Sequence, residues 1–435
     1  MYISRRLRLA APLAAFVAAG TSPAYAGGFY LQEQSPRELG RAFSGDAAAA
    51  DNASTIFFNP AGMTELAGTQ IELGAQLLFV KTAQRNQGTS RTVPGLPTSV
   101  PVTGSDGGNP FKQPVVVPNG YVSVQLTDSL WAGLGVGSPF GVSVEYDDDF
   151  FGRYDSIKSD VFTVNVQPSL AYKVNDWLSV GGGVDVQYID VELVNAVPNV
   201  SPLLPDGRLR VTGDDVSVGW NAGALATFGK VRLGAHYRSK MAHNLNGRFD
   251  LSGLTGPLAA ANVVTDATAP ITLPDIATVS AMFGVGEPLR FYGTWRWYNW
   301  SRFKNIEINP EGGAQQISPQ NYRDSWSMAL GAEYDLNDRV TLRAGTMYDE
   351  SPIQDAFRTT RVPDGDRTWL TGGIGYRLSD HFTANLSYAH VFVKTEDLNR
   401  TDSFFQGTPA QVDATIRSTN TGNVDILAFS VGATF

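Results

Sequence analysis

Cysteine is absent from the 435-residue sequence, which excludes disulfides and thiolate metal sites. Histidine is scarce: only His236, His243, His381 and His390 occur, and their positions show no metal-ligand spacing. GxSxG, HExxH and phosphate-loop motifs are also missing. We therefore expect no enzyme activity, no cofactor and no bound metal.

Two further absences limit the class of protein. No segment after residue 26 is apolar enough for a membrane helix, which needs about 20 residues. No block of Lys or Arg forms a nucleic-acid patch, so we expect no nucleic-acid partner. Without the three arginines among residues 1–26, 30 of the 33 basic residues remain against 42 acidic ones, a net charge of −12.

Residues 1–26 have the pattern of a secretory signal peptide. A basic stretch with Arg5, Arg6 and Arg8 precedes an apolar run, and Ala24 and Ala26 supply the small residues before the cleavage point. The sequence predicts cleavage after Ala26 and export. The alternative is a retained N-terminal anchor.

Most of the remaining chain alternates apolar and polar residues with a period of two, which predicts strands. Residues 178–188 and 382–392 are clear examples. We predict fourteen strands near 69–81, 115–127, 130–144, 161–174, 178–194, 215–227, 231–243, 274–285, 289–303, 321–336, 340–350, 367–378, 382–393 and 424–435. Short turns and long loops alternate between them, and an even strand count with this rhythm is typical of an outer-membrane barrel.

The composition favours a barrel that crosses lipid. The chain has 45 Gly and 47 aromatic residues, yet its mean hydropathy is only −0.12. A closed barrel satisfies its backbone hydrogen bonds internally and needs only one apolar face per strand. The predicted fold class is therefore an all-β, 14-stranded antiparallel transmembrane barrel over residues 69–435. Residues 27–68 show no strand alternation, and we expect them to form an N-terminal hatch inside it.

Several short motifs, in order along the chain, resemble the FadL family of outer-membrane long-chain fatty acid transporters. The matching segments are 39–45, Asn59-Pro60-Ala61, 300–303, 324–331, 343–345, 349–352 and 363–370. The resemblance implies a fourteen-stranded barrel with a small hatch. It also implies capture of cargo outside, entry into the barrel and sideways exit through a gap in the wall.

The third predicted strand contains the features of such a gap. These are Gly135, Gly137, Ser138, Pro139 and Gly141. Proline removes a donor from the ladder, and glycines permit a bend or bulge. We expect the hatch motif Asn59, Pro60 and Ala61 to cover this opening. The alternative is that Pro139 is an ordinary residue at a strand end.

The resemblance places the N-terminal hatch segment at an internal pocket, so we expect Phe29 and Leu31 to contact the ligand. Fatty-acid-transporting members carry basic residues in the fifth strand and before the tenth. This chain has no Lys or Arg in residues 174–207 or 305–322. Arg323 and Arg343 remain as candidates for the carboxylate, and neutral hydrocarbons or aromatics become alternative cargo.

Capture outside requires apolar residues on loops. Leu203, Leu204, Leu254 and Leu258 lie in two long loops, and residues 258–264 could form a short apolar helix. We expect a hydrophobic capture groove there. The alternative is that these leucines pack the loops together. The acidic run 147–149 is either a solvated loop or a cation site beside lipopolysaccharide.

The sequence thus predicts a monomeric barrel in the outer membrane of a Gram-negative bacterium, in contact with outer-membrane lipid and lipopolysaccharide. Its expected function is passive uptake of long-chain fatty acids, with neutral hydrophobic compounds as the alternative cargo. A general diffusion porin is a second class, which a hatch of some forty residues argues against. A lipid hydrolase is a third, for which no nucleophile and base can be identified.

Overall fold

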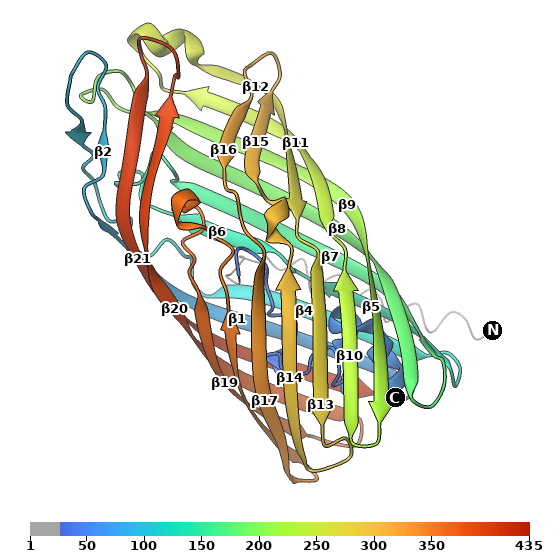
Figure 1. Ribbon diagram of the computed structural model, residues 1–435. Helices are drawn as coiled ribbons and strands as arrows, with labels where there is room; N and C mark the ends of the chain where they lie inside the picture. The colour runs from blue at the N-terminus through green and yellow to red at the C-terminus, as the bar shows by residue number, and fades with distance from the viewer. Residues whose placement is uncertain (1–26) are drawn as a thin grey trace.

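The computed structural model describes residues 27–435, so the predicted signal peptide lies outside the described residues. The chain folds into a closed 14-stranded antiparallel β-barrel, as predicted (Figure 1). Closure comes from pairing of the first and last strands, which runs from Gln70 opposite Thr434 to Asn86 opposite Ser418. Among residues 27–435, no helix is both long enough and apolar enough to cross a membrane.

Three of the fourteen crossings of the wall are interrupted, and each is built from two strands. In chain order the crossings are β1 (Thr69–Asn86), β4 (Val115–Gln125), β5 (Leu130–Gly137) with β6 (Gly141–Glu145), β7 (Lys158–Lys173), β8 (Leu178–Val197), β9 (Gly207–Phe228), β10 (Val231–Arg238) with β11 (Met241–Ser252), β12 (Val263–Leu273) with β13 (Ile276–Phe283), β14 (Leu289–Tyr298), β17 (Ser325–Asn337), β18 (Val340–Asp349), β19 (Arg367–Arg377), β20 (Phe382–Phe404) and β21 (Val412–Thr434).

The remaining short strands and helices lie in the loops and in the lumen. The loop strands are β2 (Ser90–Arg91), β3 (Val100–Pro101), β15 (Asn305–Pro310) and β16 (Gln316–Pro319). The helices are α2 (Pro36–Leu39), α3 (Thr55–Phe58), η2 (Pro60–Glu65), η3 (Gly256–Ala261), η4 (Trp300–Arg302) and η5 (Asp355–Phe357).

Where the luminal segment lies, the wall is apolar outside and polar inside. In β8, Val184, Val186 and Tyr188 are exposed, whereas Asp185 and Gln187 between them are buried. This alternation gives lipid an apolar surface and gives the lumen hydrogen-bonding groups.

Several strands are longer than predicted. Much of the predicted loop 244–273 is the hairpin β11–β12, and much of 394–423 is the extension of β20 and β21. The prediction of these segments as loops was wrong because their apolar residues, such as Leu245 and Ile416, face inward, while their outward face is polar. The ladder hydrogen bonds form without the apolar face that marks a lipid-facing strand. The expected helix at 258–264 is the 3-10 helix η3, followed at once by β12.

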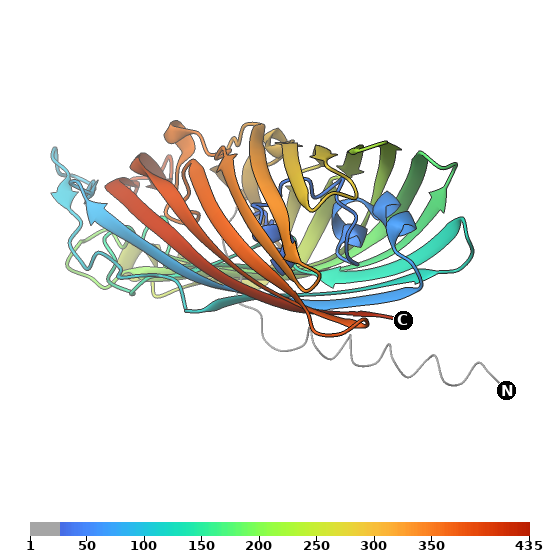
Figure 2. The ribbon, with the colours of Figure 1, turned by 90° about the horizontal axis from the view of Figure 1, so that it is seen from below.

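Residues 27–68 lie within the curved wall (Figure 2) and are called here the luminal segment. Ser35 caps α2 by accepting a hydrogen bond from the Glu38 N–H. Wall glycines let the segment approach closely: a Cβ on Gly345 would lie 2.3 Å from the carbonyl carbon of Arg41. The inner face of the wall is therefore shaped to the backbone of this segment.

Candidate ligand cavity and the kinked strand

The third crossing of the wall is broken between β5 and β6. β5 pairs with both β4 and β7, but β6 pairs only with β7 in the described part of the chain. The last pair between β4 and β5 is Gly120 with Val136, so residues 115–119 of β4 have no ladder partner on that side. The predicted residues Gly135, Gly137, Ser138, Pro139 and Gly141 all lie in or beside this kink.

The start of the luminal segment is bonded to the kink. Leu31 N–H donates to the Pro139 carbonyl at 2.8 Å, and the Gly141 N–H donates to the Phe29 carbonyl at 2.9 Å. Gln34 adds a hydrogen bond from its side-chain amide to the Ser138 carbonyl at 2.7 Å. Backbone groups that the kink removes from the wall ladder are thus satisfied by residues 29–34.

The hypothesis that Asn59, Pro60 and Ala61 lie against the kink is wrong. The Asn59 side chain donates to the Ala224 carbonyl at 3.0 Å, and it also caps η2. A Cβ on Gly181 would lie 2.5 Å from the Ala61 nitrogen. The motif therefore seats on β8 and β9, where glycines leave room for it, and the first residues of the segment occupy the kink instead.

A partly open cavity, with about 850 Å³ of empty space when the solvent at its mouth is included, borders the luminal segment at Phe29. Its wall is made mostly of apolar side chains from β6 to β9, β11, β12 and the loops at 303–322 and 361–362, among them Val142, Val161, Val191 and Leu245. Phe29 forms part of its lining. Such a lining suits an acyl chain, at about 0.8 kcal/mol per buried methylene.

Aromatic rings hold Phe29 in place. Its ring centroid lies 4.8 Å from Trp300, 5.5 Å from Phe303 and 6.2 Å from Phe140, all in edge-on geometry. Phe140 belongs to the kink, so one side chain touches the kink, the loop after β14 and the cavity. Leu31 is fully buried but does not line the cavity.

Arg343 belongs to a buried ion network and does not line the cavity. It donates to Glu333 at 2.7 Å and to Asn385 at 3.0 Å. Glu333 also pairs with Arg41 at 2.5 Å. The network therefore ties the luminal segment to the wall.

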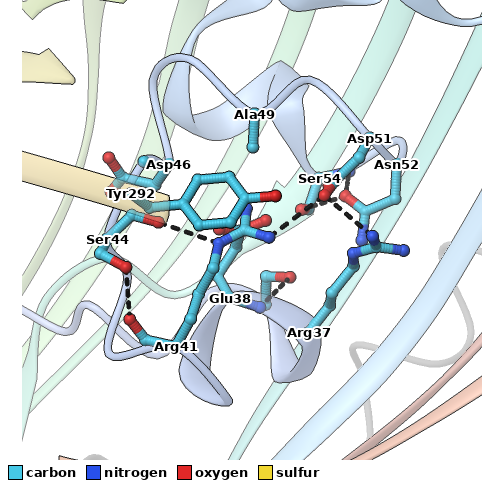
Figure 3. Close-up of polar contacts among 12 residues, drawn as sticks. Arg37, Glu38, Arg41, Ser44, Asp46, Ala49, Asp51, Asn52, Ser54 and Tyr292 are labelled. Carbon is cyan, nitrogen blue, oxygen red and sulfur yellow. Dashed lines mark hydrogen bonds and ion pairs between the residues drawn. The ribbon is translucent and has the colours of Figure 1, made fainter. Parts of the chain in front are cut away.

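The segment's side of this network is drawn in Figure 3. Arg41 pairs with Glu38 at 2.5 Å and with Asp51 at 3.1 Å. Its guanidinium also lies 4.3 Å from the centre of the Tyr292 ring. Arg37 reaches the same Asp51 carboxylate at 2.9 Å. These contacts join α2 to the turn at residue 51.

The second candidate, Arg323, is half exposed and pairs with Glu350 at 3.1 Å. It does not line the cavity either, and ligand binding by Arg323 or Arg343 stays a prediction. The basic residue in the cavity lining is Arg361, in the loop between β18 and β19. The sequence did not identify Arg361 as a cavity residue, because the same loop also contains Arg358 and no local pattern indicates which of the two faces the cavity.

The four loop leucines divide into two pairs. Leu203 is 93% exposed and Leu204 is 43% exposed. Leu254 and Leu258 are buried with Val197 in a cluster of loop side chains. Leu254 and Leu258 therefore pack the loops together, as the alternative interpretation held. A capture groove stays a prediction, and it now rests on Leu203 and Leu204.

Two histidines outside the network each pair with a carboxylate. Within residues 27–435 no group of three or more His, Asp or Glu side chains is arranged to hold a metal ion. His243 bonds Asp215 at 2.9 Å and His390 bonds Asp425 at 2.7 Å. In the acidic run, Asp148 pairs with Arg208 at 2.8 Å on the surface.

Together, these features define a transmembrane β-barrel with an internal segment, an apolar cavity and a break in its wall. The sequence profile of the family described as "Outer membrane protein transport protein (OMPP1/FadL/TodX)" matches residues 17–435. The chain belongs to this family, whose members are transport proteins, and it resides in the outer membrane of a Gram-negative bacterium.

Two relatives cover most of the chain. Outer membrane protein P1 of Haemophilus influenzae is 29% identical over 416 residues, covering 87% of this chain and 88% of its own. The long-chain fatty acid transport protein of Escherichia coli O6:H1 is 26% identical over 413 residues, covering 87% and 90%.

Solved structures share the fold. A FadL homologue from Pseudomonas aeruginosa superimposes with a TM-score of 0.83 at 24% identity, covering 94% of this chain and all of that one. The toluene transporter TodX of Pseudomonas putida gives a TM-score of 0.67 at 18% identity, covering 94% of this chain and all of that one.

Proposed function

We propose that the protein takes up long-chain fatty acids passively, by loop capture, binding in the cavity and lateral release at the kinked strand. One observation carries the proposal: Phe29 lines the cavity, and its carbonyl group is bonded to the kink at Gly141. A ligand that displaces Phe29 would disturb the contacts that cover the break in the wall. Occupation of the cavity and opening of the kink are then coupled through a single residue.

Under this proposal the luminal segment, residues 27–68, acts as the hatch of the barrel over residues 69–435. Its buried ion network holds α2 and Arg41, which follow residues 29–34 directly in the chain, against β17 and β18. Opening therefore requires only the first residues of the segment to move. The energy for transport comes from the concentration gradient, and the barrel acts as a monomer in contact with outer-membrane lipid and lipopolysaccharide.

Uptake of a labelled long-chain fatty acid by cells that lack their own transporter tests the proposal. Expression of the protein should restore uptake, and the purified protein should bind the same acid. Failure of both would refute fatty acid transport. Low single-channel conductance is expected as well, and a conductance typical of open channels would favour a general porin.

The second candidate cargo is a neutral hydrophobic compound, such as a hydrocarbon or an aromatic molecule. The observation in its favour is the lining of the cavity, which is mostly apolar and contains one arginine. Competition of a neutral hydrocarbon for the bound fatty acid separates the two. Tighter binding of the hydrocarbon would favour the second cargo.

A further inference from the structure

One cation borders the cavity, and its own ion pairing is incomplete. The guanidinium of Arg361 lies 3.9 Å from the Asp155 carboxylate, 3.5 Å from Ser159 Oγ and 3.3 Å from Asn195 Oδ1. Charge-assisted hydrogen bonds are usually about 2.7–2.9 Å long. None of the three contacts reaches that length, although the side chain is only 13% exposed.

The carboxylate nearest to Arg361, that of Asp155, is already hydrogen-bonded to another residue. Asp155 accepts hydrogen bonds at Oδ2 from the Thr360 N–H at 2.5 Å and from its hydroxyl at 2.6 Å. Burial lowers the pKa of Arg361 from its ordinary value, because the long contacts with Asp155, Ser159 and Asn195 do not offset the loss of water around the guanidinium. Other buried arginines are better paired: Arg41, for example, has two carboxylates at 2.5 Å. Arg361 is therefore a buried cation with unused capacity to bind an anion.

The position of Arg361 fixes how an amphiphile would lie. Its neighbour Ser159 stands at the start of β7, and Thr163 of the same strand bonds the backbone of Phe140 in the kink. Four residues of strand span about 13 Å. Val161 lines the cavity between these two points, and its register partner Val191 does so on β8. An apolar track thus runs from the guanidinium toward the kink.

The acidic residue in the cavity lining, Glu307, does not neutralise this cation. It lies on β15, accepts a hydrogen bond from Asn305 at 3.3 Å and forms no ion pair with Arg361 within the described residues. Among the described residues, an arriving anion therefore competes with one carboxylate, that of Asp155, whose contact with Arg361 is long at 3.9 Å.

We propose that Arg361 holds the acid head group of the cargo, while its apolar tail follows Val161 and Val191 toward Phe29. This assignment rests on the proposed function and makes it specific: Arg361 selects an acid over a neutral molecule of the same length. A planar guanidinium suits a carboxylate because it can donate two parallel hydrogen bonds.

The test compares hexadecanoic acid with hexadecanol, which share a tail length and differ in head group. Equilibrium binding at neutral pH is measured for the purified wild type, Arg361→Gln, Arg361→Lys and the control Arg248→Gln. Arg248 is exposed, and its ion pair with Asp266 lies on the surface. Heat-dependent gel mobility verifies that every variant is a folded barrel.

The wild type should bind the acid at least tenfold more tightly than the alcohol. Arg361→Gln should remove that preference and leave alcohol binding unchanged, Arg361→Lys should recover part of it, and Arg248→Gln should match the wild type. Retained preference in Arg361→Gln, or an equal loss for both ligands, would overturn the role of Arg361. Equal binding of both ligands by the wild type would overturn it too, but would leave transport standing. Binding of neither ligand would overturn the proposed function itself.

Discussion

The N–H of Gly141 donates a hydrogen bond to the carbonyl oxygen of Phe29 at 2.9 Å, across a gap of 112 positions in the sequence. Gly141 opens β6, directly after the break in the wall, and Phe29 lines the cavity. Under the proposed function, the bond joins the place where a hydrophobic ligand would sit to the place where it would leave. Changes on either side of this bond should therefore affect both binding and release.

Closing the kink should block uptake without unfolding the barrel. In Gly135→Val/Pro139→Val, a valine at 135 meets Tyr121 at 3.1 Å and Ile56 at 3.2 Å, and residue 139 regains an N–H for the ladder. We expect uptake to fall at least tenfold, with unchanged heat-dependent gel mobility. Gly293→Val is the matched control, because its Cβ meets only Leu330 at 3.5 Å and Ala329 at 3.9 Å. Unchanged uptake by the double variant would contradict lateral release at the kink.

Truncating Phe29 should weaken ligand binding. The side chain is 3% exposed and packs on Trp300 and Phe303, and loss of a buried phenylalanine costs about 3–5 kcal/mol in a protein core. In Phe29→Ala part of this cost is taken up by movement of residues 29–31. We expect affinity for hexadecanoic acid to fall about tenfold in equilibrium binding. Phe291→Ala, whose ring is 52% exposed on the outer face, should bind like the wild type. Equal affinities for the two variants would remove Phe29 from the site.

Breaking the buried ion network should loosen the luminal segment. Arg41→Gln leaves the Glu38 and Glu333 carboxylates buried without this partner, and removal of one member of a buried pair typically costs about 3–5 kcal/mol. We expect backbone amides of residues 36–51 to exchange with deuterium at least a hundredfold faster. The control Arg323→Gln removes a half-exposed pair worth at most about 1 kcal/mol. Equal exchange in both variants would show that packing alone holds the segment.

The barrel was predictable because its signal is repeated in every strand. Alternation such as that of Val184, Asp185 and Val186 marks a face toward lipid and a face toward the lumen. Turn residues then set the number of crossings. Extensions such as β11 and β12 have the opposite arrangement, with apolar residues such as Leu245 and Leu273 facing inward and mostly polar residues facing outward, so they lack the lipid-facing pattern by which the other strands were predicted.

The site was only partly predictable from the sequence. Pro139 with its flanking glycines indicates a kink, because proline removes a donor whatever the surroundings. The partner of the kink could not be predicted: Phe29 and Leu31 bond to it through backbone groups, which any residue carries. Arg361 likewise depends on the path of one loop, and no local pattern distinguishes it from Arg358.

A buried carboxyl group should make docking of the luminal segment depend on pH. Glu33 is fully buried, and no side chain among residues 27–435 hydrogen-bonds to its carboxyl group. Burial raises the pKa of Glu33 to about 8. The positive charge of Arg367 lowers this pKa, and the negative charge of Asp349 raises it. The docked state therefore holds a proton that the free state releases near pH 4.5. Docking is strongest below about pH 4.5 and weakens as the pH rises toward 8.

Hydrogen exchange of residues 29–34 at pH 6 and pH 9 tests this linkage, with Glu33→Gln measured at the same two values. Comparison at equal pH cancels the intrinsic change of the chemical exchange rate. The wild type should exchange faster than Glu33→Gln at pH 6 and by a larger factor at pH 9, because the free state of Glu33 is already ionised at pH 6 whereas the glutamine stays neutral throughout. Glu287→Gln, at an exposed turn, should follow the wild type at both values. A wild type that matches Glu33→Gln at pH 9 would show that Glu33 stays protonated there or does not resist docking when charged, and the pH dependence would then have another source.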